Sequence, residues 1–384
     1  MPLPEKLASS ESPALPGNEV RLLVDGPTTH RAMFDAMARA RSHINLETYI
    51  LAEGEIADRL AALLEKKVAD GVHVHLMYDS VGSLGTPREY FERLKQAGVK
   101  VCEFNPVQDV EKINNRNHRK MLVVDGEIAF TGGINVSQAY ASSSLWARRK
   151  PGKETKEGWR DTQVGVEGPA VAQFQRVWLD MWALQDCGPV ADGTYYPRLE
   201  RRGDKTVRLV KTDPHEGSEM YAALLKAIAQ AKHRVWLSFG YFVPDPRTKQ
   251  ALIDAARRGV DVQLVLPGFS DFWAPVNAGR SHYDQLLAAG VQIHEWHEAL
   301  MHAKSAVIDS QWSSIGSTNL DWRSFVHNYE ADLIVYDAAF GDEMERRFRL
   351  DVQAARRIDP AEWSRRGLKQ KLKERVARQW EYLL

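Results

Sequence analysis

Two short segments of the chain combine a histidine, a lysine and an aspartate at the same spacing. Each segment reads HxKxxxxD, and together they supply His118, Lys120, Asp125, His302, Lys304 and Asp309. A histidine can attack or protonate a reacting group, and a nearby ammonium group stabilises negative charge on oxygen. One such short motif can arise by chance, so the second copy is the informative observation. These residue types indicate chemistry at a phosphodiester: one neutral histidine attacks phosphorus and the other protonates the leaving alkoxide.

The similarity between the two segments continues downstream. Asn135 and Asn319 follow their histidines at the same interval, and each half then brings a carboxylate, Asp161 or Glu330, to an equivalent place. We expect the lysines and both asparagines to bind the non-bridging phosphate oxygens of the substrate. Each carboxylate is expected to fix the tautomer of one histidine through its far ring nitrogen. Such a site needs no metal ion and no other cofactor.

The motif spacing fits a strand, because residues two apart on a strand project from the same face. Each histidine would then lie beside its lysine. The apolar run after each lysine continues into a core and ends at Asp125 or Asp309, which Gly126 or Ser310 follows. That ending is typical of a turn, so these two aspartates complete the catalytic motif with a mainly structural role.

The elements around the motifs are also repeated. A helical pattern that ends at glycine and runs into an alternating strand occurs at Gly71 and Gly98, and again at Gly259 and Gly290. Strands that alternate with helices of this length predict the α/β class. We therefore expect two duplicated α/β/α sandwich domains, residues 1–195 and 196–384. The active site is expected on the pseudo-two-fold axis between them.

The paired HxKxxxxD segments resemble the signature of the phospholipase D superfamily, and the resemblance extends over nearly the whole chain. It implies the duplicated fold of that superfamily and a two-step transfer through a covalent phosphohistidine. The resemblance also implies that His118 is the nucleophile and that His302 is first the general acid and then the base. The residues themselves do not distinguish the two histidines.

Four further stretches, residues 79–83, 131–135, 240–244 and 316–324, resemble bacterial cardiolipin synthases. The resemblance implies an enzyme of phospholipid biosynthesis that transfers a phosphatidyl group from one phosphatidylglycerol to another and releases glycerol. A phospholipase D that transfers the group to water, a nuclease and a non-catalytic lipid scaffold are the alternatives. Equal numbers of basic and acidic residues argue against a nucleic-acid partner. The intact motifs argue against a scaffold.

The location of the protein is predicted from its N-terminal residues, its apolar stretches and its cysteines. Residues 1–24 include no apolar targeting segment, and no stretch approaches the roughly 18 apolar residues of a spanning helix. The two cysteines, Cys102 and Cys187, lie far apart, which predicts a reducing compartment and no disulfide. We expect a peripheral protein on the cytoplasmic side of the inner membrane. In this it resembles the shorter cardiolipin synthases that have no N-terminal spanning helices.

Two segments could contact an anionic membrane surface. The loop 267–275 contains Phe269, Phe272 and Trp273, which could form a lip for acyl chains or could cover the core between the domains. Residues 363–384 alternate basic and apolar residues, which predicts an amphipathic helix that lies on anionic lipid or packs its leucines on the second domain. A basic loop, residues 142–158, is expected to overhang the site.

Overall fold

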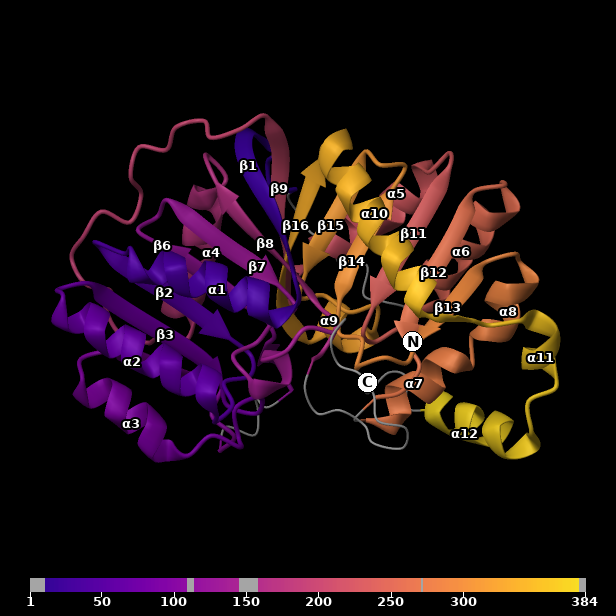
Figure 1. The fold of residues 1–384 in the computed structure, drawn as a ribbon, viewed down its shortest axis with the longest axis horizontal. Coiled ribbons are helices and arrows are strands. Elements are labelled where there is room, and N and C mark those ends of the chain that lie inside the picture. The colour runs from indigo at the N-terminus through magenta and orange to yellow at the C-terminus, as the bar shows by residue number, and fades with distance from the viewer. Residues whose placement is uncertain (1–10, 109–113, 145–157, 271, 380–384) are drawn as a thin grey trace.

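The computed structural model describes residues 11–108, 114–144, 158–270 and 272–379. These residues form two mixed sheets that lie side by side, each with helices on both faces (Figure 1). The elements of the first half are β1 (Leu15–Val24), α1 (Asp25–Ala38), β2 (His43–Thr48), α2 (Glu55–Ala69), β3 (His73–Asp79), α3 (Arg88–Gln96), β4 (Lys100–Phe104), β5 (Arg116–Asn117), β6 (Met121–Val124), β7 (Ile128–Gly132), the 3₁₀ turn η1 (Gln138–Tyr140), β8 (Thr162–Glu167) and α4 (Val171–Leu184).

The second half repeats this arrangement with a few additional elements. They are β9 (Lys205–Asp213), β10 (Gly217–Ser218), α5 (Glu219–Gln230), β11 (Arg234–Phe239), α6 (Pro246–Arg257), β12 (Asp261–Pro267), α7 (Trp273–Arg280), α8 (Tyr283–Ala288), β13 (Gln292–Trp296), β14 (Lys304–Ile308), β15 (Trp312–Gly316), α9 (Trp322–Val326), β16 (Asn328–Tyr336), α10 (Ala338–Ala354), β17 (Arg356–Arg357), α11 (Pro360–Ser364) and α12 (Leu368–Arg378).

The two sheets have the same strand order. The first sheet runs β4-β3-β2-β6-β7-β8-β1, and the second runs β13-β12-β11-β14-β15-β16-β9. In each sheet the first three strands are parallel and the remaining strands join antiparallel. The predicted α/β duplication is confirmed.

The glycines that mark the repeat end helices as predicted. Gly71, Gly98, Gly259 and Gly290 follow the last turns of α2, α3, α6 and α8 with φ of 84°, 95°, 86° and 92°. A residue with a Cβ is strained in this left-handed region, so glycine is the residue that lets the chain reverse into the next strand.

Alternation along the strands divides their apolar residues among three large cores. On β6, Leu122 and Val124 contribute to a core within the first half, whereas Met121 and Val123 contribute to a core that both halves share. The shared core also contains Trp178 of α4. Since this core contains side chains from both halves, burial of apolar surface holds the two sheets together.

Strand pairing joins the halves as well. β1 of the first half pairs antiparallel with β9, and the short β5 pairs in parallel with the start of β16. The predicted domain boundary between residues 195 and 196 stays a prediction. No helix among the described ranges is long and apolar enough to cross a membrane.

The structure corrects the prediction that the cysteines are free. Cys102 on β4 and Cys187, which follows α4, form a disulfide with Cα atoms 5.5 Å apart. The pairing was missed because 85 positions separate the two residues, and only the fold brings the end of α4 back to the edge strand. The argument from free thiols for a reducing compartment is therefore wrong.

The C-terminal prediction needs a second correction. Residues 363–379 do not form one continuous helix, because α11 ends at Ser364 and α12 begins after Gly367, which is its N-cap. Three parts of the predicted segments lie outside the described residues: most of the basic loop (145–157), Asp271 of the aromatic loop, and residues 380–384.

We predict that reduction of the Cys102–Cys187 disulfide lowers the free energy of unfolding by about 2–4 kcal/mol, because the bridge closes a long loop in the unfolded chain. Urea unfolding with and without a reductant measures the change. The double variant Cys102→Ala, Cys187→Ala is the control and should unfold identically in both buffers. Equal stability of the wild-type protein in both buffers would contradict the prediction.

Candidate active site

Each motif histidine is held by the backbone of the opposite half. The amide of His118 donates to the carbonyl of Tyr329 at 3.0 Å, and the amide of His302 donates to the carbonyl of Arg160 at 2.8 Å. Glu330 and Asp161 are the next residues in the chain after these carbonyls. The same backbone hydrogen bond between the halves occurs twice, once at each histidine. Each of these hydrogen bonds brings a carboxylate of one half next to the histidine of the other half.

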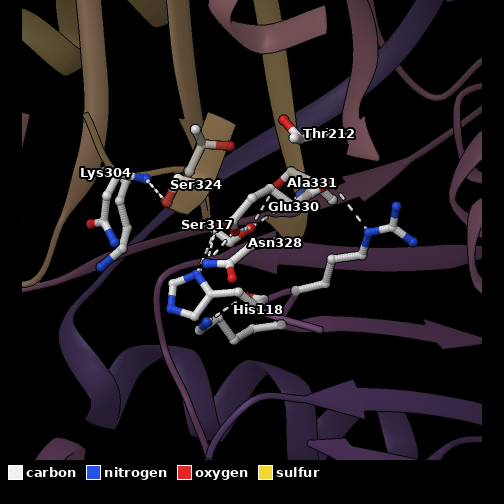
Figure 2. A network of polar contacts seen from close by, with 12 residues as sticks. His118, Thr212, Lys304, Ser317, Ser324, Asn328, Glu330 and Ala331 are labelled. Carbon is white, nitrogen blue, oxygen red and sulfur yellow. Dashed lines mark hydrogen bonds and ion pairs between the residues drawn. The ribbon is translucent and has the colours of Figure 1, made fainter. Parts of the chain in front are cut away.

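Glu330 binds the ring of His118. Its two oxygens lie 2.9 and 3.0 Å from Nδ1 of His118 (Figure 2). The hydroxyl of Ser317 donates to Oε2 of Glu330 at 2.5 Å, and the amide nitrogen of Asn328 lies 3.3 Å from Oε1. Glu330 is fully buried, so these donors and the ring proton fix its orientation.

Asp161 plays the equivalent part for His302. Its Oδ2 lies 2.7 Å from Nδ1 of His302, and its Oδ1 accepts from the backbone amide of Thr162 at 2.8 Å. The hydroxyl of Tyr140 lies 3.0 Å from the same Nδ1. In both neutral rings, a proton on Nδ1 that faces the carboxylate leaves Nε2 as the basic nitrogen.

The motif lysines are buried beside the histidines. Each ammonium group donates to the backbone carbonyl of the histidine two positions earlier, Lys120 to His118 and Lys304 to His302. Burial lowers the pKa of Lys120 to about 7, although the charge of Glu330 opposes the shift. Burial also lowers the pKa of Lys304 to about 8, opposed by Asp161.

Burial shifts the pKa values of His118, His302 and Glu330 in the direction that favours their neutral forms. It lowers the pKa of His118 well below the usual value, and the ammonium groups of Lys120 and Lys304 lower it further. Burial and then Lys304 lower the pKa of His302 to about 4. Burial raises the pKa of Glu330 to about 7 against the pull of Lys120. Both rings are therefore neutral at pH 7 in the free protein.

A cavity of about 320 Å³ opens onto both histidines. Among the residues that line it, Asn319 has a buried Oδ1 with no hydrogen-bond partner in the part of the chain that the structure describes. The remaining walls are aromatic, apolar or charged, with one further amide at Asn328: Tyr49, Ile50, Arg116, Trp159, Tyr241, Phe272, Pro275, Asp321, Arg323 and Asn328. A larger hollow of about 720 Å³ lies beside α5, but neither motif histidine lines it. The chemistry therefore belongs to the smaller cavity.

Asn135 is placed differently from Asn319. Its Oδ1 accepts from the amide of Ile50 at 2.9 Å, and its Nδ2 lies 3.4 Å from the hydroxyl of Tyr140. The described lining of the cavity includes Asn319 but not Asn135. Asn135 therefore braces two residues, Ile50 and Tyr140, that themselves lie at the cavity or against His302.

The aspartates that end the motifs lie at the far ends of their strands. Asp125 accepts backbone amides from Arg41, Ser42 and His43 at 2.8–2.9 Å. Asp309 accepts the matching amides of residues 232–234 at 2.7–2.9 Å. Each carboxylate ties the start of β2 or β11 to the motif strand, so it acts on the site through the sheet.

Two tyrosines next to the motif histidines were not predicted from the sequence. Tyr140 stands five positions after Asn135, where the second half has Ser324 after Asn319. Tyr49, whose ring lies 4.8 Å from that of His118, stands where the second half has Gly240. Position-by-position comparison of the two halves would have singled out both tyrosines, since each replaces a small residue next to a motif.

Comparison with known proteins agrees with the site. A sequence profile described as "Cardiolipin synthase, PLD-like domain" matches residues 33–145 and 224–352, which include both motifs. The chain belongs to this phospholipase D-like family. Cardiolipin synthase 1 of Bacillus anthracis is 32% identical over 95% of the chain and 72% of its own length. Cardiolipin synthase of Geobacillus thermodenitrificans is 34% identical over 96% of the chain and 73% of its own length.

Solved structures support the fold. Phosphatidylserine synthase of Haemophilus influenzae superposes over 97% of both chains with a TM-score of 0.72 at 12% identity. Polyphosphate kinase of Porphyromonas gingivalis gives a TM-score of 0.54 over 87% of the chain and 50% of its own, at 14% identity. The cross-half geometry described above thus occurs in a member of the cardiolipin synthase family on a phospholipase D-type fold.

We predict that neither His118 nor His302 takes up a proton between pH 5.5 and 8, since both have pKa values well below 6.5. Carbon-detected NMR of ¹³C-labelled histidine rings measures this directly. Lys304→Met should raise the pKa of His302, because the ammonium group of Lys304 is the largest charge that lowers it. Lys226→Met, a change on the distant α5, is the control and should leave it unchanged. A wild-type titration midpoint near 6.5 for either ring would contradict the burial argument.

Proposed function

We propose that this family member is a phosphatidyltransferase that makes cardiolipin from two molecules of phosphatidylglycerol and releases glycerol. The observation that supports it is the pair of buried histidines at one cavity, each oriented by a carboxylate of the other half. Membership in the cardiolipin synthase family supports the substrate. The two copies supply the two proton-handling roles that a double displacement at phosphorus requires.

In the first step, Nε2 of His118 attacks the phosphorus of the donor lipid. The bond from phosphorus to the glycerol headgroup breaks, and the departing alkoxide takes a proton from Nε2 of His302. His118 is assigned as the nucleophile because the first motif histidine is expected to have this role in the family. His302 must be protonated for this step, and an anionic phosphodiester in the cavity favours that form. The ammonium groups of Lys120 and Lys304 and the Nδ2 amide of Asn319 are proposed to donate to the non-bridging oxygens as charge develops.

In the second step, a hydroxyl of another phosphatidylglycerol replaces glycerol in the cavity. Nε2 of His302, now neutral, takes the proton of this hydroxyl, and the oxygen attacks phosphorus. The bond from phosphorus to His118 breaks, which releases cardiolipin. His302 then returns to solvent the proton that it took up when the donor lipid bound, which restores the free enzyme. Glu330 and Asp161 keep both rings in the required tautomer through both steps.

We further propose that the protein works while attached to the inner membrane as a peripheral protein. The lipid substrates support this proposal, since they reside in the bilayer. The predicted cytoplasmic side stays a prediction, and the disulfide removes the cysteine argument that favoured it.

Incubation of the purified protein with phosphatidylglycerol vesicles in a chelating buffer tests the proposed reaction. We expect cardiolipin and glycerol in equal amounts, identified by mass spectrometry of the lipids and assay of the released alcohol. Phosphatidic acid as the main product would instead establish a phospholipase D hydrolase. Degradation of plasmid DNA under the same conditions, without lipid turnover, would establish a nuclease.

His118→Ala and His302→Ala are each expected to lower turnover by about 10⁴-fold or more, because each removes a group that bonds to the reacting atoms or transfers a proton. In wild-type protein quenched during turnover, a phosphatidyl adduct should appear on the peptide that contains His118. His73→Ala is a matched control, since His73 lies on the exposed start of β3. An adduct on His302 alone would reverse the assigned roles, and full activity of both variants would overturn the scheme.

A further inference from the structure

The exposed side of α12 is apolar at its centre and cationic at its margins. Leu368, Leu372 and Val376 recur every four residues along the helix and are 85%, 62% and 45% exposed. At 100° per residue they form a single stripe. The five basic residues of α12 flank this stripe on both sides, and all of them are exposed: Lys369, Lys371, Lys373, Arg375 and Arg378.

The opposite side of α12 is fixed to the body of the protein. Gln370 donates to Oδ1 of Asn277 on α7 at 3.0 Å, and Ala377 packs with Ala278 of the same helix. Glu374, the one acidic residue of α12, is buried against Arg366, whose guanidinium also binds Asp284 of α8 at 2.9 Å. These contacts leave the apolar stripe no freedom to turn inward.

Helix α7 contacts both α12 and the active-site cavity. Phe272 and Trp273 are 51% and 55% exposed, and α7 and α12 pack together (Figure 1). Phe272 and Pro275 of this region also line the cavity that opens onto His118 and His302. Of the aromatic residues in this region, Phe272 therefore lies at the site and is not part of the core.

We propose that Phe272, Trp273, Leu368, Leu372 and Val376, here called the α7–α12 face, dock the protein on an anionic phospholipid bilayer. The apolar stripe enters the interfacial region, and the flanking cations of α12 bind acidic headgroups. The charge supports this partner: the chain as a whole is neutral, yet every exposed charge on α12 is positive. Trp273 is a side chain that prefers the membrane interface. Only the identity of the bound lipid rests on the proposed function.

This docking sets the direction from which substrate arrives. Because Phe272 belongs both to the α7–α12 face and to the cavity lining, the mouth of the cavity opens next to the bilayer. A lipid can then place its phosphodiester between the two histidines while its acyl chains stay in the membrane.

Sedimentation with vesicles tests the proposal on the full chain. Leu368→Ser, Leu372→Ser, Val376→Ser combined should lower the partition onto phosphatidylglycerol-containing vesicles by about tenfold or more. Wild-type binding to pure phosphatidylcholine vesicles should also be about tenfold weaker or more, because the cations lose their partners. Leu350→Ser is the matched control: Leu350 is 51% exposed on α10, outside this face, and its loss should leave binding unchanged.

Two readouts separate this proposal from the proposed function. His118→Ala should bind vesicles like wild-type protein, so binding is measured without turnover. On a short-chain, water-soluble phosphatidylglycerol the triple variant should keep wild-type turnover and lose it only on vesicles. Unchanged vesicle binding by the triple variant would overturn the docking proposal. The proposal would also be overturned if the wild-type protein did not bind vesicles but formed a dimer, and the triple variant were a monomer. Failure of wild-type protein to convert either lipid would overturn the proposed function alone.

Discussion

The crossing of two chain segments from one half into the other is the constraint on which the site depends. The amide of His118 is bound by the carbonyl before Glu330, and the amide of His302 is bound by the carbonyl before Asp161. Each ring therefore receives its carboxylate from the half to which it does not belong. Neither half contains a complete histidine–carboxylate pair, so the shared apolar core that joins the sheets is as necessary for the site as the motifs themselves.

The geometry is maintained at an electrostatic cost. Two ammonium groups and two carboxylates lie in a region where their side chains are almost completely buried, and the pKa values of Lys120 and Glu330 both move to about 7. The opposite charges and the hydrogen bonds from Ser317 and Asn328 offset part of this cost. In return, the low dielectric strengthens each interaction with a substrate phosphate, and the groups do not have to reorient when charge develops.

The sequence predicted those features that repeat locally. The motif pairs, the glycines that end helices and the two carboxylates all recur at matching places. Because each feature occurs in both halves, its second copy supports the interpretation of the first. It could not predict which carboxylate meets which histidine, because that depends on how the halves pack. Tyr140 and Tyr49 were missed because each breaks the repeat instead of following it, and the Cys102–Cys187 pair was missed because a single long-range contact has no local pattern.

Helix α12 shows that the spacing of apolar residues predicts a helix but does not predict what its apolar side contacts. The repeat of Leu368, Leu372 and Val376 predicted an amphipathic helix, but it could not decide whether the apolar side meets the protein or its surroundings. The structure decides this through polar contacts with the body of the protein, since Gln370 binds Asn277 and Glu374 binds Arg366. A helix that buries its one acidic residue and exposes its leucines reverses the usual arrangement of a surface helix. Such a reversal favours a second apolar environment on the outer side, and the cations on both margins of the stripe match the acidic headgroups of a bilayer.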